Sequence, residues 1–228
     1  MITFGGKLIL LDIEGTVSPL AFVHEVMFPY ARQRAGAYLT THWGTAVMAQ
    51  LAHDAGAPAF ASPYEAEAAV YLLMEADAKV TGLKQLQGMI WEEGFRNGEL
   101  RSTLFEDVPL ALADWFRLGR EIRIYSSGSI HAQKLFFAHT ESGNLNPHFS
   151  GYYDTTTGSK RETGSYTAIA ADCGLPAEQI LFVSDLVEEL NAARTAGMFT
   201  ALTLRPGNKP VPPHDHPAIT TFSDIILA

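Results

Sequence analysis

Two carboxylates stand two residues apart directly after a short apolar run, and this pair is the strongest chemical signal in the sequence. Residues 8–11 are apolar throughout, and Asp12 and Glu14 follow them before a Gly-Thr pair. A short apolar run that ends at polar residues is typical of a buried parallel strand. Asp12 is therefore expected at the carboxyl end of that strand, the edge where open α/β sheets bind ligands. Two carboxylates at such an edge repel each other and lose hydration, so they indicate a bound cation or a catalytic task.

Three further polar clusters stand where the expected fold would bring them to the same edge. They are Ser126 and Ser127 after a strand predicted over 121–125, Lys160 in a Gly-Ser-Lys loop, and Asp185 after a strand predicted over 180–183. A parallel sheet puts the carboxyl ends of all its strands on one edge, so these side chains are expected to converge with Asp12. The converging set contains acids, hydroxyls and one cation.

This inventory suits phosphoryl transfer through a carboxylate. A nucleophilic aspartate attacks phosphorus, and a second acid two residues further on protonates the leaving oxygen and later activates water. Mg²⁺, held by oxygen ligands, offsets the charge between aspartate and phosphate. A hydroxyl and a lysine hold the non-bridging oxygens of the phosphoryl group.

Each cluster also has a purely structural interpretation. The serine pair 126–127 suits an ordinary strand-to-helix turn with a capping serine, and Lys160 taken singly is typical of a surface lysine. Asp185 suits a helix N-cap, while Glu188 and Glu189 suit first-turn acids that complement the helix dipole. The four clusters together, in this order and at these places, favour the chemical interpretation.

Composition places the chain among well-packed globular proteins. It has 228 residues, of which 47% are apolar and 18% charged, and its net charge is −9. This excludes a disordered chain, and the negative charge disfavours nucleic acid or an anionic membrane as a partner. Cys173 is the one cysteine, which suits a reducing cytoplasm. Residues 1–11 are expected to form a strand and not a signal peptide, and no apolar run approaches the ~18 residues of a membrane-spanning helix.

Helices and strands are distributed unevenly along the chain. Residues 19–100 show helical patterns with a break at 55–63, whereas strands and helices alternate after residue 100. Besides the strands above, strands are predicted over 152–153 and 199–204, and helices over 108–118, 132–138, 165–173 and 188–196. Such alternation predicts an α/β fold with a doubly wound parallel sheet. The core is expected to comprise residues 1–18 and 101–228, with residues 19–100 inserted as an all-helical cap over the carboxyl edge of the sheet.

The proline-rich stretch 205–221 is predicted to be mostly loop. Within it, His214 and His216 flank Asp215 and could form a metal clamp. In a loop of this kind the cluster is instead expected to be solvated.

Several stretches resemble the enolase-phosphatases of the methionine salvage pathway, a family of the haloacid dehalogenase-like phosphohydrolases. They are residues 12–16 (Asp-Ile-Glu-Gly-Thr), 22–30, 83–100, 125–129, 154–160, 184–190 and 205–208. The resemblance covers nearly the whole chain, including the cap, and the cap stretches distinguish this family from other phosphatases of the superfamily. After Thr16, the chain has Val17 and Ser18 where the family is expected to have a threonine-rich run. This difference leaves the assignment of the hinge into the cap open, but it does not affect the assignment of the catalytic acids.

The resemblance implies both a substrate and a set of residue roles. The family enolises 2,3-diketo-5-methylthiopentyl-1-phosphate, a small phosphorylated diketone, and then removes phosphate to give the acireductone 1,2-dihydroxy-3-keto-5-methylthiopentene. It implies Asp12 as nucleophile and metal ligand, Glu14 as second acid and metal ligand, Asp185 as metal ligand, Ser126 and Ser127 as substrate binders, and Lys160 as a catalytic and substrate-binding residue. One Mg²⁺ per chain and a monomer are expected, and Glu189 is expected to act through water.

Two other functions stay open at this point. One is a different enzyme on the same scaffold, either another Mg²⁺-dependent phosphomonoesterase or a dehalogenase, which needs no metal and would not use Glu14. The other is a catalytically silent binding protein that retains the fold.

Overall fold

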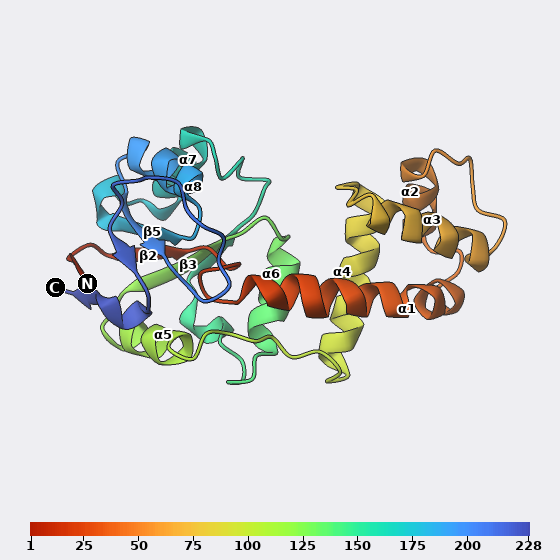
Figure 1. The fold of residues 1–228 in the computed structure, drawn as a ribbon, viewed down its shortest axis with the longest axis horizontal. Helices are drawn as coiled ribbons and strands as arrows, with labels where there is room; N and C mark the ends of the chain where they lie inside the picture. The colour runs from red at the N-terminus through yellow and green to blue at the C-terminus, as the bar shows by residue number, and fades with distance from the viewer. The chain divides into compact units, whose positions relative to one another are not determined.

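Two units make up the chain, and the computed structural model describes all of residues 1–228. One unit joins residues 1–22 to residues 101–228, and the other comprises residues 23–100 (Figure 1). The first junction follows residue 22, four residues after the predicted 18/19 boundary. Ser18 and Phe22 belong to the larger unit, because Ser18 Oγ donates to the Thr103 carbonyl at 2.8 Å and the Phe22 ring packs edge-on against Phe136.

A six-stranded parallel sheet forms the centre of the larger unit, in the order β4-β3-β2-β5-β6-β7. Its strands are β2 (Leu8–Leu11), β3 (Glu121–Tyr125), β4 (Gly151–Tyr153), β5 (Ile180–Ser184), β6 (Phe199–Thr203) and β7 (Ala218–Ile219). Strand β2 is buried along its whole length because it has neighbours on both sides, β3 and β5. The chain adds β3 and β4 on one side of β2 and β5 to β7 on the other. The order therefore reverses beside β2, at the position where doubly wound sheets bind ligands.

Helices cover both faces of this sheet, as the doubly wound prediction requires (Figure 1). They are α5 (Val108–Arg117), α6 (Ile130–Ala138), α7 (Thr163–Cys173) and α8 (Val187–Thr195). Side chains of α7 and α8, among them Ile169 and Leu190, pack with Phe182 of β5 in one buried cluster. Helix α7 ends at Gly174, which adopts the left-handed conformation with φ of 64°. The predicted α/β fold is confirmed.

Three short strands depart from the predictions. Residues 1–11 do not form one strand: β1 (Ile2–Phe4) pairs with β8 (Ile225–Leu227) in a separate two-stranded sheet. The chain breaks at Gly6, where a Cβ would lie 2.2 Å from the Phe4 ring and 2.7 Å from the Gln179 carbonyl oxygen. Strand β7 lies inside the stretch predicted to be loop. It is only two residues long, so its pairing with β6, and not its own sequence, defines it.

The smaller unit is all-helical. A π-helical turn (Phe22–Met27) leads into α1 (Phe28–Thr41), followed by α2 (Ala46–Asp54), α3 (Pro63–Glu75) and α4 (Thr81–Arg96). The break predicted at 55–63 separates α2 from α3. Ser62 begins α3 by accepting a hydrogen bond from the Glu65 amide at 3.2 Å, a typical N-cap. Leu39, Leu51 and Leu86 from three of the helices pack in one buried cluster, which gives this unit a core of its own.

Candidate active site

Strands β2 and β5 bring two acids to the same point on the sheet edge. Leu11 and Val183 are paired in register, so Asp12 follows one strand directly beside the end of the other. The Asp12 amide donates to the Val183 carbonyl at 3.0 Å, which extends the ladder by one residue. Asp185 follows β5, and the side chains of both acids are buried. The predicted convergence of these two strand ends is what the structure shows.

Lys160 lies buried between two carboxylates. Its Nζ is 2.5 Å from Asp12 Oδ1 and 2.7 Å from Glu189 Oε2, and 7% of its side chain is exposed. Burial disfavours the charge of this ammonium, but the attraction of the two carboxylates outweighs burial and raises the pKa of Lys160 above its ordinary value. Lys160 is therefore a charged residue of the site, and the surface-lysine interpretation is excluded.

Hydroxyl groups of neighbouring elements hold the loop that carries Lys160. The Tyr125 hydroxyl donates to the Gly158 carbonyl at 3.1 Å, and the Tyr166 hydroxyl donates to the Lys160 carbonyl at 2.7 Å. Gly158 has φ of 138°, and a Cβ there would lie 2.3 Å from Ser165 Oγ. The glycine before Lys160 is thus required both by its backbone conformation and by the close approach of α7.

Glu189 makes a contact that the sequence did not predict. It lies on α8, and Oε2 accepts hydrogen bonds from Lys160 Nζ and from Ser184 Oγ, the latter at 2.9 Å. Burial raises the pKa of this carboxyl to about 7; Lys160 opposes the rise and the Asp12 carboxylate adds to it. Glu189 therefore contacts Lys160 directly, where an action through water was expected. The position of Glu189, four residues after Asp185, was the sequence signal for an acid of the site. That spacing does not predict which residue the acid contacts.

Asp185 carries the least compensated charge of the cluster. Burial raises its pKa to about 7, and the nearby carboxylates of Asp12 and Glu189 add to the rise, while Lys160 offsets only part of it. Gly15 makes room for this carboxylate: it has φ of 70°, and a Cβ there would lie 2.5 Å from Asp185 Oδ2. The cluster thus has three buried carboxylates and one ammonium, an imbalance that a bound cation would correct.

The donor set fits Mg²⁺. Asp12 and Asp185 offer carboxylate oxygens at the point where charge is uncompensated, and Mg²⁺ is usually bound through one or two carboxylates together with waters and substrate phosphate. No group of three or more histidine, cysteine, aspartate or glutamate side chains has the arrangement of a protein-only metal cluster. Glu14 lies on the turn after Asp12 and is half-buried. Ligation by Glu14 stays a prediction.

The two serines after β3 differ in burial. Ser126 is buried, its amide donates to the Tyr153 carbonyl at 3.2 Å, and its Oγ accepts from the Gly128 amide at 3.3 Å. Ser127 is exposed. The N-cap of α6 is instead Ser129, which accepts from the Ala132 amide at 3.2 Å. Because another serine caps the helix, the capping interpretation of the pair is wrong.

Residues after β6 support the turn that follows Asp12. Thr203 Oγ1 donates to the Gly15 carbonyl at 3.1 Å, and Arg205 Nε donates to the Thr16 carbonyl at 3.2 Å. The guanidinium of Arg205 also binds both carboxylate oxygens of Asp107, at 2.8 and 3.0 Å. The sequence signalled the stretch 205–208 only through the family resemblance and assigned it no role.

The prediction that the histidine cluster near the C-terminus is solvated is wrong for His216, whereas the Asp215 side chain is 84% exposed. His216 is buried: Nε2 donates to Asn191 Oδ1 at 2.9 Å, and Nδ1 accepts from Thr200 Oγ1 at 2.8 Å and from Arg194. Asp215 pairs with Arg194. His216 is therefore a hydrogen-bonded structural residue, held neutral because two donors face its Nδ1.

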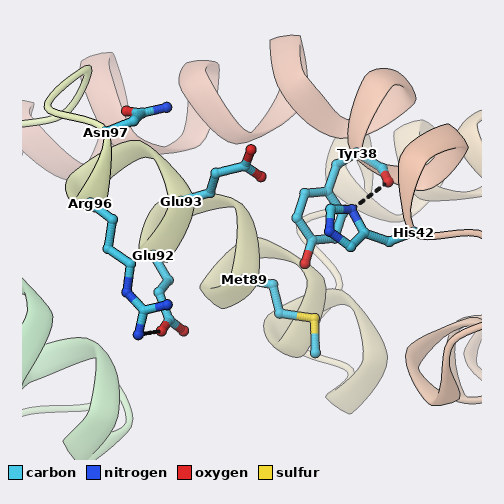
Figure 2. A pocket seen from close by; sticks show the side chains of 7 residues that line it. All are labelled: Tyr38, His42, Met89, Glu92, Glu93, Arg96 and Asn97. Atoms are coloured by element: carbon cyan, nitrogen blue, oxygen red, sulfur yellow. Dashed lines mark hydrogen bonds and ion pairs between the residues drawn. The ribbon is translucent and has the colours of Figure 1, made fainter.

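The helical unit has a hollow of its own, of about 490 Å³. It is lined by Tyr38, His42, Met89, Glu92, Glu93, Arg96 and Asn97 (Figure 2). The Tyr38 and His42 rings stack with centroids 4.0 Å apart, and Arg96 pairs with Glu92 at 2.5 Å. None of the site residues predicted from the sequence lines this hollow.

Comparisons with known proteins agree on one family. The haloacid dehalogenase-like hydrolase family matches residues 7–197. The chain is 47% identical to Enolase-phosphatase E1 of Synechococcus elongatus over 95% of this chain and 96% of that protein, and 44% identical to Enolase-phosphatase E1 of Aquifex aeolicus over 96% and 98%. Among solved structures, the UTR4 protein of Saccharomyces cerevisiae aligns with a TM-score of 0.80 at 34% identity, over 95% of this chain and 98% of that one. A haloacid dehalogenase, L-2-haloacid dehalogenase RSc1362, aligns with a TM-score of 0.57 at 18% identity, which shows the fold alone.

Proposed function

The chain belongs to the haloacid dehalogenase-like hydrolases and, within them, to the enolase-phosphatases, and we propose that it acts on 2,3-diketo-5-methylthiopentyl-1-phosphate. The substrate is enolised and then dephosphorylated to the acireductone 1,2-dihydroxy-3-keto-5-methylthiopentene. The observation that carries the proposal is the buried contact of Lys160 with Asp12 at the switch point of the sheet. This contact sets a charged lysine beside Asp12, the strand-end acid to which we assign the attack on phosphorus.

Asp12 is the nucleophile in this mechanism. A carboxylate oxygen of Asp12 forms a bond to phosphorus while the bond from phosphorus to the substrate oxygen breaks. Glu14, two residues further along the turn, gives a proton to the departing oxygen. It then takes a proton from the water that cleaves the aspartyl-phosphate, which restores Asp12 and releases inorganic phosphate.

Lys160 orients the nucleophile and binds the phosphoryl group. An ammonium has three N–H donors, and Asp12 and Glu189 take two of them. The third is available for a non-bridging phosphoryl oxygen, whose charge increases during transfer. Ser126 and Ser127, at the end of the adjacent strand β3, supply hydroxyls for the same substrate.

Mg²⁺ is the cofactor in this proposal, one per chain. Asp12 and Asp185 would hold it through side-chain oxygens, and Glu14 through its main-chain carbonyl, because a carboxylate bound to the metal could not carry the proton that Glu14 gives to the departing oxygen. When bound, Mg²⁺ offsets the repulsion between the carboxylates and the incoming phosphate. Three buried carboxylates against one ammonium support this assignment.

We further propose that the protein acts as a cytoplasmic monomer on small molecules and binds no nucleic acid. The net charge of −9 supports the last point, because phosphate backbones repel an acidic surface. No helix has both the length and the apolar character that a membrane crossing requires. Light scattering of the purified protein tests the monomer, and a mass of twice 24.9 kDa would exclude it.

The decisive experiment follows the diketone phosphate by ultraviolet absorbance and inorganic phosphate in the same reaction. We expect both enolisation and phosphate release. Both should be lost when a chelator removes the metal, and both should return when Mg²⁺ is added. Release of phosphate from aryl phosphates but not from the diketone would indicate another phosphomonoesterase of this superfamily. Metal-independent turnover of a haloacid would indicate a dehalogenase, and inactivity towards every one of these compounds would indicate a binding protein.

A further inference from the structure

Asn208 has a buried amide oxygen that receives no hydrogen bond within the protein. Its Nδ2 donates to the Gly15 carbonyl at 2.9 Å and to the Thr203 carbonyl at 3.2 Å. These two acceptors fix the orientation of the amide, because a flipped side chain would set oxygen against oxygen. Oδ1 therefore points away from both carbonyls, and its missing donor needs an explanation.

The unpartnered oxygen lies beside the least compensated acid of the site. From the position that a Cβ on Gly15 would occupy, Asp185 Oδ2 is 2.5 Å away and Asn208 Oδ1 is 2.9 Å away. Two acceptors thus flank the same small space, which exists because residue 15 is glycine. A buried acceptor without a donor is unfavourable, the more so beside a carboxylate oxygen, and a proton donor that reaches both oxygens would relieve it.

We propose that Asn208 is a positioning residue for the metal site, with Oδ1 accepting a hydrogen bond from a water molecule of the Mg²⁺ shell. The inference rests on the proposed Mg²⁺ at Asp12 and Asp185. Mg²⁺ loses its waters reluctantly and keeps several of them when bound to protein. Partners that hydrogen-bond to the ligands of a metal contribute about 10- to 100-fold in affinity.

A simpler role for Asn208 is to clamp the turn after Asp12, and the structure offers a matched control for it. Thr203 Oγ1 donates to the same Gly15 carbonyl at 3.1 Å and contacts Thr16 Oγ1 at 3.2 Å. Thr203→Val keeps the side-chain shape, removes that clamp and leaves Asn208 Oδ1 in place. Asn208→Leu removes both the clamp and the oxygen. If Asn208 only clamps the turn, the two variants should weaken metal binding alike.

The test is the dissociation constant of Mg²⁺ alone, measured on the full chain by isothermal titration calorimetry and by the Mg²⁺-dependent rise in melting temperature. We expect Asn208→Leu to raise the constant by about 10-fold or more, Thr203→Val to change it by less than about threefold, and Asp185→Asn to abolish binding. Asn208→Ala, which adds no bulk, replaces the leucine variant should that chain not fold.

Two results would overturn the inference and are distinct from failure of the proposed function. Binding by Asn208→Leu as tight as wild type would show that Oδ1 plays no part. Equal weakening in Asn208→Leu and Thr203→Val would reduce Asn208 to a clamp. A wild-type chain that binds no Mg²⁺ would instead refute the metal assignment on which the inference rests.

Discussion

Asp185→Asn should stabilise the metal-free protein, although it removes a proposed metal ligand. Burial and two neighbouring carboxylates raise the pKa of Asp185 from 3.8 to about 7. A rise of that size corresponds to a penalty of about 4 kcal/mol on the native state once both states are ionised. Asparagine has nearly the same shape and no charge. Its amide must still find a partner in the site, so we expect a net gain of about 2 kcal/mol, or about 4–8 °C in melting temperature for a protein of this size.

The gain should depend on pH in a defined direction. The native carboxyl keeps its proton up to about pH 7, whereas the unfolded one loses it near 3.8. Between these values the native state binds more protons, so wild-type stability falls as pH rises. The asparagine that replaces Asp185 does not titrate, so the cost of burying its amide is the same at every pH. The variant should therefore be less stable than wild type near pH 4, become more stable than wild type between pH 5 and 6, and reach its full advantage above pH 7.

Thermal melts in a chelator at pH 5 and pH 8 measure this difference. Glu188→Gln is the matched control, because Glu188 is an exposed acid in the first turn of α8, three residues after Asp185, and its removal should change the melting temperature little. Adding Mg²⁺ should raise the melting temperature of wild type and not that of Asp185→Asn. The reasoning is refuted if the metal-free variant melts no higher than wild type at pH 8, or if its advantage is the same at both pH values.

Three further predictions concern the site and its surroundings. Asp12→Asn keeps the shape but removes the nucleophile, so phosphate release in single-turnover assays should fall at least ~10³-fold; near-normal release would contradict the nucleophile assignment. Lys160→Met should lower kcat/KM about 10²-fold. It leaves Asp12 and Glu189 buried without their cation, so it should also cost about 3 kcal/mol of stability at pH 8. Urea melts measure this cost, and adding Glu189→Gln should partly restore the stability; an unchanged stability of Lys160→Met would refute the buried contact. Burial and Arg194 hold the pKa of His216 below 6.5, so the stabilisation by this neutral histidine is present above pH 6.5 and is lost as pH falls towards the lowered pKa. The urea midpoint of His216→Gln should accordingly depend less on pH between 5 and 6.5 than that of wild type. Equal pH dependence of the two midpoints would contradict this.

The sequence predicted the strand ends of the site because their signal is local. An apolar run that stops at polar residues defines both a strand and its carboxyl end, and parallel topology then brings separate ends together. Asp12 and Asp185 could therefore be placed on the same edge of the sheet from their positions after β2 and β5, while the pairing of these two strands is seen only in the structure. Lys160 was included in the predicted convergence although a Gly-Ser-Lys loop carries no strand signal, and its role beside the phosphate was implied by the family resemblance.

Side-chain contacts between elements that are distant in the sequence could not be predicted in this way. Whether Glu189 faces Lys160 or solvent depends on how α8 rotates against the loop before α7, and the sequence of either element is compatible with both. His216 shows the same limit, because its burial depends on Asn191 and Thr200 from elements far along the chain. Strand β7 was missed for a related reason: two residues contain no period, and only the neighbouring strand defines them.

The position of Lys160 explains how an acidic protein can accept a phosphate. Lys160 contacts Asp12 and Glu189, so Asp185 and the remaining oxygen of Asp12 stay available for a cation. With the proposed Mg²⁺ in place, three carboxylates face one ammonium and one divalent ion, and their formal charges cancel.

A phosphate dianion would then enter a site that is neutral locally, although the chain as a whole has a net charge of −9. Without Glu189 the site would be positive before substrate arrives, and Lys160 would lose the second anchor that fixes its third N–H. Glu189 therefore neutralises one positive charge of the site and, through the same contact, fixes the orientation of the Lys160 ammonium. We accordingly expect the loss of Glu189 to change substrate affinity as well as stability.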